Sequence, residues 1–128
     1  MVVLTLLLHH SRHTARHLLG VPGGFCDADE TASHAVAREC AEEIGVIPTD
    51  IKFIGAFPNT YEYNGITYKT CDMYFTAHMP AEYDLRLQDA EVASTQWYPI
   101  DSAADIEKLP LAFDSLRRAL MMRLSAKE

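Results

Sequence analysis

The run from Gly24 to Val46 constrains this chain more than any other feature of its sequence. It holds four glutamates and one arginine at fixed spacing between two glycines: Glu30, Arg38, Glu39, Glu42 and Glu43. Carboxylates held close together resist ionising at the same time, so clustering them is costly unless a cation is bound. The run therefore indicates a cation-binding segment, and the fold must bring these side chains together.

The same run predicts a turn followed by a helix. Pro22-Gly23-Gly24 should end a strand in a sharp turn, because glycine reaches backbone angles closed to other residues. From about Thr31 to Ile44 the chain lacks proline and glycine and is rich in alanine and glutamate, which favours helix. Thr31 or Asp29 can cap the start of this helix, and Gly45 suits its C-terminal cap.

Helical periodicity separates the side chains of this segment into two faces. The acidic face carries Glu39, Glu42 and Glu43, and the apolar face, expected toward the core, carries Val36, Cys40 and Ile44. Oxygen ligands favour a hard cation, Mg²⁺ or Mn²⁺. Neighbouring glutamates more often form a solvated acidic face, but the glycine turn, Glu30 and Arg38 at this spacing favour the metal site.

As a pattern, residues 24–46 follow G-x5-E-x7-R-E-U-x-E-E-x-G-U, where U is a bulky apolar residue. This resembles the Nudix box, the signature of the Nudix (MutT-like) hydrolases. Cys40 stands where an aliphatic residue is usual, and Asp29 where a glycine often precedes the glutamate; neither change removes a candidate ligand. The resemblance implies an α/β fold in which residues 1–128 form a single Nudix domain, an α/β/α sandwich around a mixed sheet.

The resemblance also implies roles for the box residues. The Gly24 carbonyl with Glu39, Glu42 and Glu43 would hold the metal, while Glu30 and Arg38 support the carboxylates. Arg38 is expected to pair with Glu30 or Glu43 rather than touch substrate. The general base is either Glu39 or a glutamate in a later acidic loop.

Candidates outside the box come from two segments. Glu91, six residues before Trp97, resembles the glutamate of the family's late acidic loop, a further metal ligand or general base; a surface carboxylate is the alternative, and Asp89 the fallback. Arg12 and Arg16 could contact substrate phosphates, although a solvated loop is favoured for them. A zinc site on a helix through His9, His13 and His17 has little room between the neighbouring strand and turn.

The remaining sequence predicts strands at residues 2–8, 51–57, 59–63, 66–78 and 94–100. Asn64-Gly65 predicts a two-residue hairpin turn with Tyr63 opposite Ile66 and Tyr61 opposite Tyr68. Asp101 is expected to cap a short helix reaching about Lys108, and Pro110 to open a last helix. Its apolar stripe is Phe113, Leu116, Leu120 and Leu124, and the aromatic rings of Phe25, Phe57, Phe75 and Trp97 are expected in the core.

The chain has fewer residues before its glycines than Nudix domains usually have. Either the first N-terminal strand of the family is missing or the connection is shortened. A missing strand would leave an exposed edge, which invites pairing with another chain, so a homodimer is one expectation.

The composition of the chain limits the kinds of partner that it is expected to bind. The 128 residues suit one domain, and 18 acidic against 11 basic side chains give a net charge of −7, which argues against duplex nucleic acid and membrane surfaces. Residues 2–8 are too short to cross a membrane. Three cysteines without zinc spacing favour a reducing, cytoplasmic setting.

The expected activity is Mg²⁺- or Mn²⁺-dependent hydrolysis of a nucleoside diphosphate linked to another group, with a nucleotide-type small molecule as substrate. An alternative is a non-catalytic domain that binds or senses nucleotides. A third class, a metal-dependent isomerase on the same scaffold, would need a catalytic cysteine–glutamate pair in a deep pocket.

Overall fold

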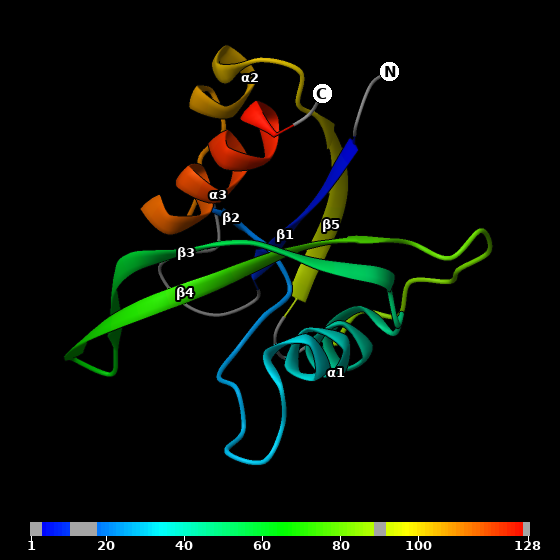
Figure 1. Ribbon diagram of the computed structural model, residues 1–128, viewed down its shortest axis with the longest axis horizontal. Coiled ribbons are helices and arrows are strands. Elements are labelled where there is room, and N and C mark those ends of the chain that lie inside the picture. The colour runs from blue at the N-terminus through cyan, green and yellow to red at the C-terminus, as the bar shows by residue number, and fades with distance from the viewer. Residues whose placement is uncertain (1–3, 11–17, 89–91, 127–128) are drawn as a thin grey trace.

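The computed structural model describes residues 4–10, 18–88 and 92–126. In Figure 1 a long hairpin crosses the molecule, with α1 (Ala32–Ile44) on one side of it and α2 (Ala103–Glu107) and α3 (Asp114–Ser125) on the other. This layering confirms the α/β class. Arg12, Arg16, Asp89 and Glu91 lie outside the described residues, so their roles stay predictions.

One sheet has three strands. β1 (Leu4–His10) lies between β2 (Leu19–Gly20) and β5 (Val92–Pro99), and both pairings are antiparallel. Since His9 belongs to β1, a helical zinc site through this residue is ruled out. In β1 the side chain of Leu7 is fully buried, as expected for an apolar strand at the centre of a sheet.

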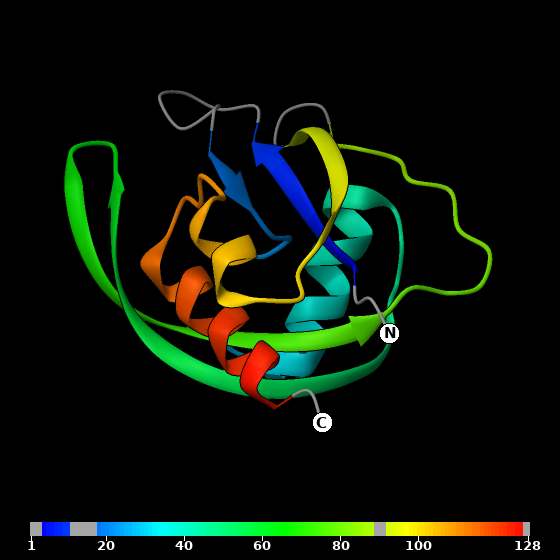
Figure 2. The ribbon, with the colours of Figure 1, turned by 90° about the horizontal axis from the view of Figure 1, so that it is seen from above.

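The second sheet is the hairpin of β3 (Thr49–Tyr63) and β4 (Ile66–His78). Asn64 and Gly65 both have positive φ, 51° and 77°, which is the backbone that a two-residue hairpin turn requires. The predicted register is confirmed, because Tyr63 pairs with Ile66 and Tyr61 with Tyr68. Seen from above, the hairpin curves around the rest of the domain (Figure 2), and irregular pairing near Gly55 accompanies this curvature.

The expected single mixed sheet is wrong for the described residues. They form two separate sheets whose strands pair antiparallel, and parallel pairing is confined to a bridge between Leu19 and Leu111. β2, which has only two residues, pairs with β1 and with neither strand of the hairpin, so it does not join the hairpin to the three-stranded sheet.

Three helices cover the sheets: α1 (Ala32–Ile44), α2 (Ala103–Glu107) and α3 (Asp114–Ser125). Two predicted helix starts are wrong. Ser102, not Asp101, caps α2, because its side chain accepts from the Asp105 N–H in a capping box. Pro110 does not open α3, since its carbonyl instead accepts the Leu19 N–H at 2.8 Å.

The main core lies between the three-stranded sheet and helices α2 and α3. It contains Leu7, Leu19, Ile100, Ile106, Leu109, Leu116 and Leu120, with Phe113 and Leu124 packed against it, so the predicted apolar stripe of α3 is confirmed. A smaller cluster of Ile44, Val46 and Val92 lies at the C-terminal end of α1, joined by Cys40, Leu85 and Leu87. Among the described residues, no helix is long and apolar enough to cross a membrane.

Candidate metal and catalytic site

The site is built on α1, and its ends are set by local sequence. The Thr31 side chain accepts the His34 N–H at 3.1 Å, so Thr31 is the N-terminal cap. Gly45 has φ 73° and its N–H donates to the Ala41 carbonyl at 3.1 Å, which confirms the predicted left-handed C-terminal cap. These caps set the two ends of α1, and the helical period within them places Glu39, Glu42 and Glu43 on one face.

Arg38 is the hub of the acidic cluster. Its Nη2 lies 2.7 Å from Glu30 Oε1 and its Nε donates to Glu30 Oε2 at 3.1 Å, a two-point contact. Nη1 lies 2.9 Å from Glu39 Oε1 and 3.3 Å from Glu42 Oε2. Arg38 therefore pairs with Glu30, as predicted, and one of its nitrogens also holds two carboxylates of the acidic face.

The electrostatics of the cluster follow from these contacts. The hydrogen bond from Arg38, followed by one from the Asp27 N–H, lowers the pKa of Glu30 to about 2. The same pairing with Glu30, reinforced by Glu39, raises the pKa of Arg38 above its usual value. Glu30 and Arg38 are thus both charged at neutral pH.

Glu43 differs from the other glutamates of the face because it is buried, with 5% of the residue exposed. Its Oε2 accepts the backbone N–H of Gly23 at 3.0 Å. The side chain of Glu42, by contrast, is 51% exposed. Helical spacing alone treats these two neighbours alike, so this difference was missed in the sequence.

Gly24 contacts Glu39, and the reason for a glycine here differs from the predicted one. Positive φ among the glycines is confined to Gly45 and Gly65, so the turn at Gly23 and Gly24 does not need glycine for its backbone angles. A Cβ on Gly24 would lie 2.5 Å from Glu39 Oε1, whereas one on Gly23 would meet nothing within 4 Å. Gly24 is therefore required for close approach to the carboxylate.

The candidate metal ligands are all oxygen atoms, which suit a hard cation. Glu39 and Glu42 share one nitrogen of Arg38, and the Gly24 backbone lies against Glu39. Within the described residues, however, no three His, Cys, Asp or Glu side chains converge as a ready metal-binding group. Some of the oxygen ligands that Mg²⁺ or Mn²⁺ would need therefore lie close together, but the described residues do not form a complete site.

The Cys40 thiol, which lies near the acidic cluster, is not activated as a nucleophile. Burial, reinforced by the negative charges of Glu43 and Glu39, raises the pKa of the Cys40 thiol to about 11, so it stays protonated at neutral pH. Cys26 and Cys71 are exposed.

The expected core position of four aromatic rings is not met in full, since Phe57, Phe75 and Trp97 are only half-buried. Phe25 is not in the core: it is 72% exposed, although Arg38 Nη2 donates to its carbonyl at 3.2 Å. Tyr61 packs against Phe113 with ring centroids 5.9 Å apart, which supports a packing role for this tyrosine.

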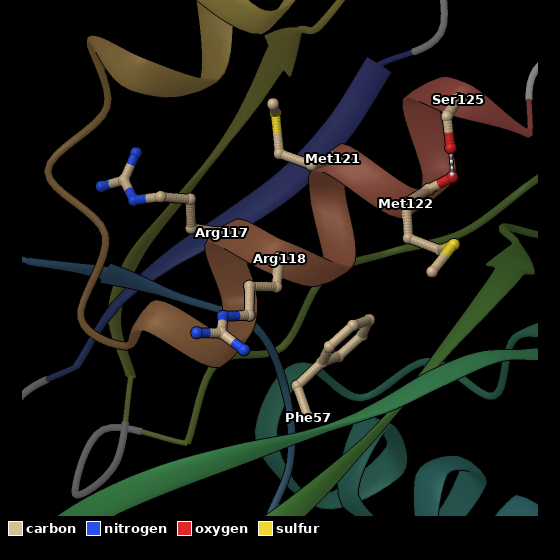
Figure 3. A pocket seen from close by; sticks show the side chains of 6 residues that line it. All are labelled: Phe57, Arg117, Arg118, Met121, Met122 and Ser125. Atoms are coloured by element: carbon tan, nitrogen blue, oxygen red, sulfur yellow. Dashed lines mark hydrogen bonds between the residues drawn. The ribbon is translucent and has the colours of Figure 1, made fainter.

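A shallow groove of about 430 Å³ lies between α3 and β3 (Figure 3). Its walls are Phe57, Arg117, Arg118, Met121, Met122 and Ser125. No box residue lines it, and α3 lies on the opposite side of the hairpin from α1 (Figure 1). The groove is therefore separate from the acidic cluster.

The fold and the site together define a class: an α/β domain whose glycine turn and glutamate-rich helix form one acidic unit. The profile of the NUDIX domain matches residues 5–121, and the chain belongs to the Nudix family. The family predicted from residues 24–46 is therefore confirmed.

Several relatives carry hydrolase names. The chain is 29% identical over 97 residues to the NAD-capped RNA hydrolase NudC of Vibrio cholerae, covering 76% of this chain and 33% of that protein. It is 32% identical over 85 residues to Nudix hydrolase 10 of Arabidopsis thaliana, covering 66% of this chain and 29% of that protein. The chain thus spans about a third of the length of these curated relatives.

Solved structures agree on the fold. The NUDIX domain of Shewanella oneidensis NrtR, crystallised with ADP ribose, superposes with a TM-score of 0.69 at 31% identity, covering 95% of this chain and 77% of that one. A C. elegans Ap4A hydrolase has a TM-score of 0.68 at 21% identity, covering 94% and 83%, and supports the fold alone.

Proposed function

We propose that this chain hydrolyses a nucleoside diphosphate linked to another group, using Mg²⁺ or Mn²⁺. The observation that carries the proposal is the close approach of the Gly24 backbone to the Glu39 side chain. Glu39 lies on α1, where Arg38 also binds its carboxylate. Relatives named as hydrolases in the same family support it. The linked group and the nucleobase are left open.

The proposed metal ligands are the Gly24 carbonyl, Glu39, Glu42 and Glu43, with Glu91 joining them from the late loop. A divalent cation bound there would neutralise substrate phosphates and lower the pKa of a bound water. Glu39 or Glu91 would take the proton of the attacking water. Arg38 and Glu30 would keep the ligands oriented, and Arg12 and Arg16 remain candidates for phosphate contacts.

Metal binding should stabilise the fold. Any ligand that binds only the folded state adds stability, by about 2.7 kcal/mol at a hundredfold excess over its Kd. We therefore expect millimolar Mn²⁺ to raise the melting temperature and a chelator to reverse the gain. A melting curve unmoved by either treatment contradicts the site.

Gly24→Ala should weaken Mn²⁺ binding by roughly 10- to 100-fold, the range for disturbed ligand orientation. The added methyl would push Glu39 Oε1 from its place, yet the flexible side chain can give way, so the melting temperature without metal should change little. Gly23→Ala is the matched control, because its methyl meets nothing within 4 Å. Equal Mn²⁺ affinities in the two variants, measured by electron paramagnetic resonance, would refute this role for Gly24.

The second candidate function is a domain that binds or senses a nucleotide without turnover. It is favoured by the NrtR NUDIX domain, 31% identical and crystallised with ADP ribose. NrtR has also been crystallised with a 27mer DNA.

One experiment separates the two functions. The protein is incubated with Mg²⁺ and a panel of nucleoside diphosphate compounds that includes ADP-ribose, and products are identified by mass. Hydrolysis is expected to give a nucleotide and a phosphorylated fragment. Saturable ADP-ribose binding with no product from any compound favours the sensing domain instead.

A further inference from the structure

Three consecutive residues after β2 are each contacted by a charged side chain of α1. We call Gly23–Phe25 the glycine loop. Glu43 contacts Gly23, Glu39 contacts Gly24 and Arg38 contacts Phe25. The path of the glycine loop is therefore set by side chains of the helix, over a sequence separation of 13 to 20 residues.

The contact made by Glu43 is the one that depends on a buried group. Its residue is 5% exposed, and its Oε2 accepts the Gly23 N–H at 3.0 Å. Burying a carboxylate is costly unless hydrogen bonds replace its water, and a bond from a backbone N–H to a charged oxygen is among the stronger ones. The position of Gly23 is thus tied to that of Glu43.

We infer that Glu43 is a positioning residue: by fixing Gly23 it places the Gly24 backbone against Glu39. This role differs from the metal-ligand role proposed above, because it needs an acceptor oxygen of the right reach and not a negative charge. The expected effect of Glu43 on metal binding rests on the proposed function. The positioning of the glycine loop by the Glu43–Gly23 hydrogen bond does not.

Two variants separate reach from charge. Glu43→Gln keeps an oxygen that can accept the Gly23 N–H but removes the charge, and Glu43→Asp keeps the charge but is one methylene shorter. Glu42→Gln is the control, since Glu42 lies next to Glu43 on the helix and its side chain is half exposed.

The test is amide hydrogen exchange at Gly23 and Gly24 by NMR, with melting curves to confirm that each variant is folded. In Glu43→Asp we expect exchange at Gly23 to be faster by about tenfold or more, as for loss of a hydrogen bond to a charged group. In Glu43→Gln and Glu42→Gln it should stay within about threefold of the parent protein, which corresponds to less than one such bond.

A Gly23 amide that exchanges as slowly in Glu43→Asp as in the parent protein would overturn the inference. So would Glu43→Gln exchanging as fast as Glu43→Asp, because then the contact with Gly23 needs the negative charge as well as the reach. Mn²⁺ affinity, measured on the same samples, should fall in Glu43→Gln. Absence of Mn²⁺ binding in the parent protein counts against the proposed function, while the exchange result still decides the hold on the loop.

Discussion

Glu91→Gln is expected to lower kcat on a confirmed substrate by about 10²–10⁴-fold, the usual cost of losing a general base. The residues on either side of Glu91 are connected to α1, the helix that carries the acidic cluster. The Gln88 N–H donates to the Glu43 carbonyl at 2.9 Å, and the Val92 N–H donates to the Gln88 carbonyl at 2.8 Å. The described residues on both sides of positions 89–91 therefore lie at the C-terminal end of α1.

Asp89→Asn is the matched control, since it removes a charge from the same segment, and it should do much less. The melting temperature should be nearly unchanged in both variants. If Glu91→Gln keeps near-normal kcat, Glu91 is not the base, and Glu39 is the remaining candidate. The kcat of both variants is measured by steady-state kinetics with saturating Mg²⁺.

Arg38→Ala should lower both activity and stability. It removes the guanidinium that binds Glu30 at two points and lies 2.9 Å from Glu39 Oε1. Loss of such an orienting partner typically costs about 10- to 100-fold in metal affinity or activity. A fall of this size in Mn²⁺ affinity is expected, together with a lower melting temperature.

The exposed Arg118 provides the control. It pairs with Asp114 at 3.0 Å on the surface of α3, one turn along the helix, where ion pairs contribute little. Arg118→Ala should therefore leave metal affinity unchanged and melting nearly so. If the two arginine variants behave alike, Arg38 does not support the site.

Arg38→Ala should also change how the melting temperature depends on pH. The pKa of Glu30 is lowered from 4.5 to about 2, so its contribution to stability is complete above about pH 4.5 and is lost as the pH falls toward 2. Arg38→Ala should return this pKa toward its ordinary value. The variant's relative loss of melting temperature should then be largest at neutral pH and smaller near pH 2, a trend that thermal scans can measure.

Features with a local physical cause could be predicted from the sequence. The limits of α1 follow from Thr31 as cap and Gly45 in the left-handed conformation. The hairpin register follows from Asn64-Gly65, because a two-residue turn leaves one pairing for the strands. The pairing of Arg38 with Glu30 was likewise predictable from the box.

Features that depend on contacts between distant segments were not predictable in this way. The Pro110 carbonyl accepts the N–H of Leu19, which is far away in the sequence, and α3 begins only at Asp114. The Ser102 capping box, by contrast, joins residues three apart and was missed although it is local. Phe25 was expected in the core but is exposed, since the contact of its carbonyl with Arg38 fixes the backbone and not the ring.

The residue pattern alone was enough to predict a helix with an acidic face in an α/β domain of the Nudix family. The burial and the contacts of each glutamate on that face became visible only in the folded chain. Glu42 and Glu43 are adjacent and chemically identical, yet one is half exposed and the other holds Gly23 in a buried contact. The physical reason is that burial depends on which other segments cover the helix, and helical spacing encodes the face of a residue but not what packs against it.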